Sequence, residues 1–197
     1  MVTVAVDAMG GDKGPDAVVQ GAALLSREDV DIHVRLVGDA AVVHEALSKV
    51  RYDPRRVSVV SADGFVAPTD DPRCVRDRPQ CSVMRAAELV KTGEVDAMVS
   101  CGNTGGLILA ASTHLRRIPG VRRAALAAVY PTEQKHGPKG NPFALILDVG
   151  ATTQTDAEAL VGFAAMGSAY SAIVSEVRAP RVALLSNGSE PHKGTPA

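Results

Sequence analysis

The chain contains no tryptophan and only three Phe and three Tyr, so aromatic residues make up 3% of its 197 residues. Single-stranded nucleic acids are bound largely by stacking on aromatic side chains, and this composition argues against such a platform. The charges nearly cancel, with 21 Lys and Arg against 22 Asp and Glu. Because no uniform positive field would attract a polyanion, we expect no nucleic-acid partner.

Cysteine is also scarce, with three residues, Cys74, Cys81 and Cys101, and no C-x-x-C spacing. Neither a disulfide framework nor a zinc site is indicated, and we expect a cytoplasmic protein with no metal or cofactor. No apolar run reaches the roughly 18 residues of a membrane span. The first residues have no basic segment followed by an apolar one, so no signal peptide is expected.

Apolar residues, 46% of the chain, occur in strand-length runs that end in polar, glycine-rich segments. Because these runs are continuous rather than alternating, they predict strands buried on both faces, as in a parallel sheet. The predicted strands are 2–7, 32–37, 57–61, 95–100, 124–130, 143–148 and 182–186. Helical spacing between them predicts helices at 15–26, 40–50, 82–91, 104–116 and 156–176. The alternation predicts a layered α/β/α fold with a largely parallel sheet and right-handed crossovers, in a single domain over residues 1–197.

Two segments interrupt this alternation and are predicted to be surface loops. One is residues 63–80, rich in Pro, Asp and Arg, and the other is residues 132–142. Surface loops carry function more often than cores do. The chain stops soon after the last predicted strand, and we expect further sequence to follow it.

Polar, glycine-rich segments follow four predicted strands, and in open α/β sheets ligands bind beyond the carboxyl ends of the strands. These segments are DAMGGDKG at 7–14, CGNTGG at 101–106, DVGAT at 148–152 and NGSEPHKG at 187–194. The second indicates an anion site, because glycines expose backbone N–H groups and Asn103 or Thr104 can cap the following helix. An ordinary strand-to-helix turn explains the same residues. The segment is not a P-loop, since no Gly-Lys-Ser/Thr follows its glycines.

The segment at 7–14 does not fit the dinucleotide pattern G-x-G-x-x-G, so a nicotinamide site is not expected. It could equally be a glycine turn with solvated charges. Cys101 could be a nucleophile, but we expect a small buried thiol, since no histidine is near in sequence. The histidines at 33, 44 and 114 are expected to be structural. Asp7, Asp12 and Asp148 could bind a cation, although such carboxylates also cap helices and orient lysines.

Together these motifs resemble the bacterial phosphate acyltransferase family (PlsX), which transfers acyl groups from acyl carrier protein to phosphate in phospholipid synthesis. The matching stretches are VAVDAMGGDKGPD at 4–16, SVMRAAELVKTGEVDAMVSCGNTGG at 82–106, RIPGVRRAALAAVYPT at 117–132, LILDVGA at 145–151 and FAAMGSAYS at 163–171. The combination is specific, and it runs along nearly the whole chain in one order.

This chain also departs from the family pattern. Cys101 stands where the family usually has Ala, and Thr152 where it usually has Asn. Arg76 and Arg78 are the cations where the family usually has Lys and a Ser pair, and the loop at 187–194 has one acidic residue fewer. Family members are longer, and their further sequence completes the sheet, the cleft and much of the dimer contact.

The resemblance implies a fold similar to that of the isocitrate and isopropylmalate dehydrogenases. It implies a homodimeric enzyme, cytoplasmic or peripherally membrane-associated, whose partners are acyl carrier protein and inorganic phosphate. Lys193, Asn187 and Asp148 are then the expected catalytic residues. The expected phosphate- or acyl-binding residues are Asp7, Gly10, Gly11, Gly102, Asn103, Thr104, Gly105 and Gly150. In this interpretation Asp7 and Asp148 orient the donors of the site.

Acyl carrier protein is acidic, and two basic clusters could attract it: the arginines of 116–123 and the basic residues of 135–139. Both could also be ordinary solvated surface. Three other functions remain open: a phosphotransacetylase-like enzyme using acyl-CoA, a truncated family member that dimerises or binds a partner without catalysis, and a metal-dependent decarboxylating dehydrogenase. The last has little support, because an Arg-rich substrate site beside clustered Asp ligands is not evident.

Overall fold

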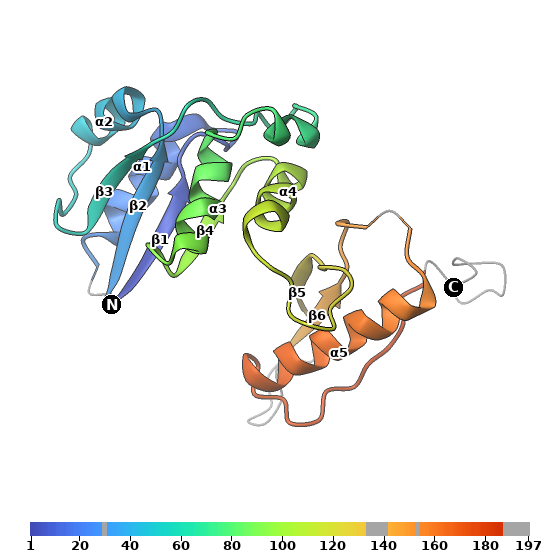
Figure 1. The fold of residues 1–197 in the computed structure, drawn as a ribbon. Helices are drawn as coiled ribbons and strands as arrows, with labels where there is room; N and C mark the ends of the chain where they lie inside the picture. The colour runs from blue at the N-terminus through green and yellow to red at the C-terminus, as the bar shows by residue number, and fades with distance from the viewer. Residues whose placement is uncertain (29–30, 133–141, 153, 187–197) are drawn as a thin grey trace. The chain divides into compact units, whose positions relative to one another are not determined.

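The computed structural model describes residues 1–28, 31–132, 142–152 and 154–186. The chain divides into two compact units, residues 1–116 and residues 117–197 (Figure 1). Each unit is described by itself below. The single domain over residues 1–197 stays a prediction.

The first unit is built on a four-stranded parallel sheet. Its strands are β1 (Val2–Asp7), β2 (Ile32–Gly38), β3 (Val57–Ser61) and β4 (Ala97–Ser100), in the order β3-β2-β1-β4. The four strands predicted in this part of the chain are confirmed, although β4 begins two residues later than expected. The parallel arrangement places the ends of β1 and β4 side by side, with Asp7 opposite Ser100.

Four helices and one short 3-10 helix connect or follow these strands. They are α1 (Gly14–Leu25), α2 (Ala40–Ser48), η1 (Pro72–Arg76), α3 (Ser82–Thr92) and α4 (Thr104–His114). The helix boundaries have local causes. Pro15 lies in the first turn of α1, where its missing N–H costs nothing. The Asp39 carboxylate caps α2 by accepting hydrogen bonds from the N–H groups of Ala41 and Val42, and Gly93 ends α3 with a φ of 74°.

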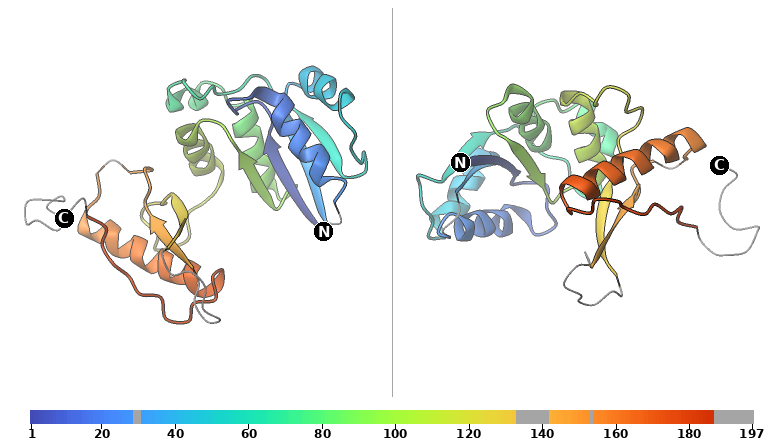
Figure 2. Two further views of the ribbon diagram at one scale, coloured as in Figure 1. Left: turned by 180° about the vertical axis from the view of Figure 1, so that it is seen from behind. Right: turned by 90° about the horizontal axis from the view of Figure 1, so that it is seen from below.

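Helices cover both faces of this sheet, α1 and α2 on one face and α3 on the other (Figures 1 and 2). Alternate residues of β2 point to opposite faces. Val34 and Leu36 pack with α1 and α2, whereas Val37 packs with Ala86 and Leu89 of α3. The unit therefore has three layers, as the predicted α/β/α fold requires.

The described residues of the second unit form two strands and one long helix. β5 (Ala127–Pro131) and β6 (Phe143–Leu147) pair antiparallel in a sheet of their own, and α5 (Ala157–Ile173) packs against β6. At Gly167 the helix comes so close to β6 that a Cβ would lie 2.6 Å from Cδ1 of Leu147. The sequence predicted that these two strands belong to the largely parallel main sheet, whereas the structure has them as a separate antiparallel pair.

The strand predicted at 182–186 is wrong. These residues do not form a strand, and the run finds no strand to pair with among the described residues. Its apolar side chains are largely exposed, with Leu185 80% accessible. Most of the predicted loop at 132–142 lies outside the described residues, whereas the loop at 63–80 is irregular except for η1, as expected.

Candidate anion site at the end of the parallel sheet

The carboxylate of Asp7 organises the carboxyl edge of the sheet. Asp7 is the last residue of β1 and is only 2% exposed. Its Oδ2 accepts a hydrogen bond of 2.8 Å from the hydroxyl of Ser100 at the end of β4. Its Oδ1 accepts from the backbone N–H groups of Met9 at 3.1 Å and Gly10 at 3.3 Å. Both carboxylate oxygens are engaged, so Asp7 acts here as a positioning residue.

Ser100 links Asp7 by hydrogen bonds to the loop that follows β4. Its Oγ donates to Asp7 and accepts a hydrogen bond of 3.2 Å from the backbone N–H of Gly102. Our sequence interpretation did not include Ser100 among the site residues. The signal was present in part, because Ser100 is the last residue of a predicted strand and directly precedes the glycine-rich segment 101–106.

The two glycine-rich loops touch through their backbones. A Cβ on Gly102 would lie 2.8 Å from the carbonyl oxygen of Gly10 and 2.9 Å from its Cα. A Cβ on Gly10 would lie 2.7 Å from Oδ2 of Asp7. Only glycine permits so close an approach. Gly11 is different, because a Cβ there would meet Cβ of Cys101 at an ordinary 3.7 Å.

Asn103 holds the start of α4 in place. Its Oδ1 accepts a hydrogen bond of 2.9 Å from the N–H of Gly106, which makes it the N-cap of the helix. Its Nδ2 lies within hydrogen-bonding distance of three carbonyl oxygens of the 63–80 loop, at 3.2 Å from Ala67, 3.3 Å from Pro68 and 2.9 Å from Asp70. The predicted capping role is confirmed, and the side chain also fastens a distant loop to the site.

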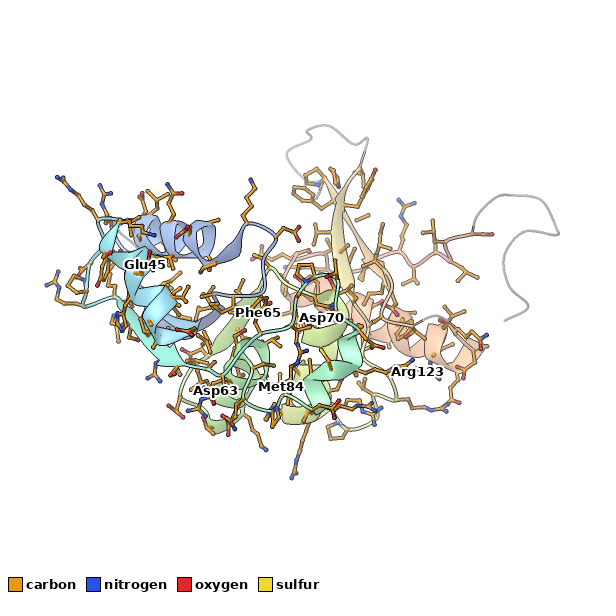
Figure 3. The ribbon with its side chains drawn as sticks, turned by 90° about the horizontal axis from the view of Figure 1, so that it is seen from above. Glu45, Asp63, Phe65, Asp70, Met84 and Arg123 are labelled. Carbon is orange, nitrogen blue, oxygen red and sulfur yellow. The ribbon has the colours of Figure 1, made fainter. Side chains whose placement is uncertain are left out.

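The 63–80 loop is itself braced beside this helix end. The carboxylate of Asp70 accepts from the N–H of Ala67 and from the guanidinium of Arg78, which also donates to the carbonyl of Phe65. The hydrogen bonds from the N–H of Ala67 and then from the guanidinium of Arg78 hold the pKa of Asp70 below its ordinary value. Figure 3 labels Phe65 and Asp70 on this segment. A Cβ on Gly105 would lie 2.6 Å from Cγ of Pro72, so the loop packs directly on α4.

This arrangement suits an anion. The first N–H groups of an α-helix have no partner within the helix, and the helix dipole adds a partial positive charge at the same end. In α4 the N–H of Gly106 is taken by the cap, which leaves the start of the helix at Thr104 and Gly105 to face a ligand. Thr104 is exposed, and its hydroxyl is a further donor. Phosphate is one of the anions that such helix starts bind in proteins, together with sulfate and carboxylate groups.

Cys101 corrects one expectation. We expected a small buried thiol, but Cys101 is exposed at the turn between β4 and α4. The buried thiol is that of Cys81, and burial raises its pKa. The expected placement of the histidines is confirmed, since His33 lies in β2, His44 in α2 and His114 at the end of α4.

Asp148 and Gly150 belong to the second unit. The Oδ1 of Asp148 accepts hydrogen bonds from the N–H groups of Leu126 at 2.9 Å and Ala151 at 3.0 Å. Burial acts to raise the pKa of Asp148, but these bonds and those from Thr152 outweigh it, and the pKa lies below its ordinary value. Asp148 therefore ties the end of β6 to the residue that precedes β5 by one position. Gly150 has a φ of 129°.

The remaining expected residues lie elsewhere. Lys193 and Asn187 are outside the described residues, as are the basic residues of 135–139. In the arginine cluster at 116–123, Arg117 donates to the carbonyl of Arg122, Arg122 pairs with Glu158, and Arg123 donates to the carbonyl of Gln154. Three of these four arginines are thus engaged within the protein.

No cluster of three or more His, Cys, Asp or Glu side chains among the described residues could hold a metal ion. No helix in the described part of the chain has the length and apolar character needed to cross a membrane.

The sequence of the chain matches a known protein family along nearly its whole length. The family described as "Fatty acid synthesis protein" matches residues 2–197. The chain is 40% identical over 192 residues to the phosphate acyltransferase of Fusobacterium nucleatum, with 97% of the chain and 56% of that relative covered. It is 42% identical over 194 residues to that of Exiguobacterium sibiricum, with 97% and 56% covered. For the Bacillus subtilis phosphate acyltransferase the identity is 41% over 192 residues, with 97% and 55% covered. The chain thus spans about half the length of the curated relatives it matches.

Proposed function

The chain belongs to the fatty acid synthesis protein family, and on this premise we propose that it serves a phosphate acyltransferase reaction. The reaction transfers a fatty acyl group from acyl carrier protein to inorganic phosphate and yields an acyl phosphate. The observation that carries the proposal is the glycine-rich start of α4, which Asp7, Ser100 and Asn103 fix at the edge of the sheet. It offers a phosphate dianion fixed N–H donors without a metal.

Phosphate is the nucleophile in this reaction. One of its oxygens attacks the carbonyl carbon of the thioester, and the electron pair of the C=O bond moves to oxygen in a tetrahedral intermediate. When the carbonyl reforms, the C–S bond breaks and the thiolate leaves, taking up a proton. The protein must hold phosphate beside the carbonyl and stabilise the intermediate oxyanion.

The residues divide into two roles in this proposal. The backbone N–H groups of Thr104 and Gly105 receive the phosphate, whereas Asp7 and Asn103 keep that backbone in place. The N–H of Gly102 donates to Ser100, so Gly102 contributes through this link and its close contact with Gly10. The side-chain amide of Asn103 is used by the 63–80 loop and by the helix, so its contribution is through position. Gly10 and Gly11 form the facing loop.

We assign the oxyanion to Lys193, assisted by Asn187, because a lysine ammonium is a mobile point charge that suits a developing negative charge. Asp148 orients donors in the same proposal, and Gly150 lies beside it in sequence. A cytoplasmic homodimer with peripheral membrane association remains part of the proposal by resemblance to the family. Acyl carrier protein is the proposed donor, and acyl-CoA is the competing one.

The decisive experiment measures acyl phosphate formation from acyl-acyl carrier protein and phosphate. It compares the 197-residue chain with a version extended to the length of the relatives, and it includes an acyl-CoA arm. We expect activity with the carrier-bound substrate in the extended version. Activity with acyl-CoA alone would overturn the proposed donor, and no acyl phosphate in either version would favour a binding protein without catalysis.

Two variants of the active form test the site. Ser100→Ala breaks the link between Asp7 and Gly102, and we expect a higher KM for phosphate. Lys193→Ala is expected to lower kcat/KM by about 100-fold or more, the effect typical of losing one oxyanion donor. Unchanged kinetics in both variants would contradict the assignment.

A further inference from the structure

A second charged feature lies at the opposite edge of the parallel sheet. The end of α1 and the connection from α2 to β3 border a wide, open surface cavity of about 640 Å³. Four arginines line it, Arg27, Arg51, Arg55 and Arg56, together with the acidic residues Glu28 and Asp53. Arg56 directly precedes β3, so the cavity is at the amino edge. At about 3.3 Å per strand residue, the sheet separates it from the Asp7 edge by roughly 20 Å.

The walls of this cavity are fixed by hydrogen bonds to buried groups. The hydroxyl of Ser26, only 3% exposed, donates to the carbonyl of Ala23 at 2.8 Å and accepts from the N–H of Asp53 at 3.0 Å. The carbonyl of Arg56 accepts from the N–H of Val34 in β2 at 2.8 Å. The connection is therefore held to both α1 and the sheet before any ligand arrives.

Two of the four arginines are engaged within the protein. The guanidinium of Arg55 contacts both carboxylate oxygens of Asp53, at 3.2 and 3.0 Å, and lowers the pKa of Asp53 to about 2. The guanidinium of Arg56 donates to the carbonyl of Glu28 at 2.7 Å. The other two, Arg27 and Arg51, are exposed and have no acidic partner among the described residues.

The cavity thus has four positive side chains against two negative ones. This excess complements a phosphate monoester, which carries about −1.5 to −2 at neutral pH. Arginine is suited to such a group, because its planar guanidinium can donate two parallel hydrogen bonds to phosphate oxygens.

A smaller hollow of about 230 Å³ adjoins the cavity and shares Arg27 and Arg51 with it. Its apolar lining comes from Ala23, Leu24 and Val50. Leu24 is 55% exposed although it is a large apolar residue in a unit that buries most others. An anion bound between the two arginines would place an attached apolar group over this hollow.

We propose that this cavity binds a phosphate monoester that carries an apolar chain, with its phosphate between Arg27 and Arg51 and its chain along Leu24. The site is separate from the anion site at α4 and does not rest on the proposed acyltransferase function. The competing explanation is that the arginines only balance the negative carbonyl end of α1. That explanation requires no ligand.

The test is calorimetric titration of the 197-residue chain with dodecyl phosphate below its micelle concentration, with inorganic phosphate as the head-group probe. We expect dodecyl phosphate to bind more tightly than inorganic phosphate. The double variant Arg27→Gln/Arg51→Gln should weaken binding at least about tenfold, since charge-assisted hydrogen bonds are lost. Leu24→Ser should remove the preference for the alkyl chain and leave inorganic phosphate binding unchanged.

Matched controls separate this site from its alternatives. The double variant Arg76→Gln/Lys91→Gln removes the same charge elsewhere in the unit and should bind as the unchanged chain does. Equal binding by the Arg27→Gln/Arg51→Gln chain would overturn the proposal. Binding lost in Ser100→Ala but kept in that chain would overturn it too, since the ligand would then occupy the α4 site. Binding to phosphatidic acid vesicles without binding of dodecyl phosphate would assign the arginines to a membrane surface instead.

Discussion

The two units bury very different amounts of apolar surface. Of the 25 buried hydrophobic residues among those described, all but Ala159 and Phe163 lie in residues 1–116. The second unit instead exposes large apolar side chains, among them Val161 at 70% and Ile173 at 79% on α5. In the part of this unit that the structure describes, the sheet has two strands, and α5 contacts one of them.

The difference shows that apolar helices and strands with similar sequence patterns can be stabilised by very different amounts of tertiary packing. A helix that is apolar on all sides, as α5 is, is typical of a helix covered on more than one side. Two-stranded sheets are marginal without further packing. We therefore expect the first unit to unfold cooperatively and the second to open at lower cost, as regions with few buried contacts do.

The largest effect should come from the core of the first unit. Leu36 lies in β2 and is fully buried, so Leu36→Ala should destabilise this unit by about 2–5 kcal/mol through lost burial and a cavity. The comparison variant Ile173→Ala, at a side chain that is 79% exposed, should change stability by less than about 0.5 kcal/mol. Urea unfolding followed by circular dichroism measures both. Equal effects would contradict the difference between the units.

The next effect concerns the contact of the two glycine-rich loops. In Gly102→Ala the new Cβ would lie 2.8 Å from the carbonyl oxygen of Gly10, and backbone rather than a flexible side chain must move. We expect a loss of about 1–3 kcal/mol, the usual cost of overpacking. Gly11→Ala is the matched control, because its Cβ would meet only an ordinary contact at 3.7 Å. If both variants unfold at the same urea concentration, the close approach is not needed.

A smaller effect compares the helix caps of the two units. Asn103 caps α4 and fastens the 63–80 loop, whereas Asp156 caps α5 through a single hydrogen bond to the N–H of Ala159 at 2.8 Å. Either substitution by Ala should cost about 0.5–2 kcal/mol, with Asn103→Ala at the upper end. Hydrogen exchange should also show faster exchange in residues 67–72 for Asn103→Ala only. Unchanged exchange there would mean that the amide does not hold the loop.

The fold of the first unit was predictable because its signals are local. Pro15 and Asp39 mark the starts of α1 and α2, and Gly93 marks the end of α3. Continuous apolar runs also predicted the four parallel strands. The run at 182–186 has the same composition and is not a strand, because a strand exists only where another strand pairs with it. Strand pairing depends on residues that are distant in sequence, so a local apolar pattern does not specify whether a partner strand is present.

The candidate site was predictable in part for the same reason. The carboxyl ends of parallel strands lie at one edge, which predicted that edge for both Asp7 and the segment 101–106. The structure shows in addition that their strands are neighbours. The contacts of the Asn103 amide with the 63–80 loop could not be predicted, since nothing in either segment specifies the other. The backbone contact between Gly10 and Gly102 is likewise tertiary, and the sequence alone suggested ligand binding for both glycines.

The smallest effect should be the pH dependence that His114 gives the first unit. Burial, followed by the positive charge of Lys91, lowers the pKa of His114 below its usual 6.5, although Glu88 acts in the opposite direction. Below pH 6.5 the unfolded chain then binds more protons at this histidine than the folded chain, so stability falls as the pH drops through this range. His114→Gln should therefore reduce the change of the urea midpoint between pH 7 and pH 5. An unaltered pH dependence of the midpoint in His114→Gln would show that this half-buried histidine at the end of α4 does not couple folding to protons.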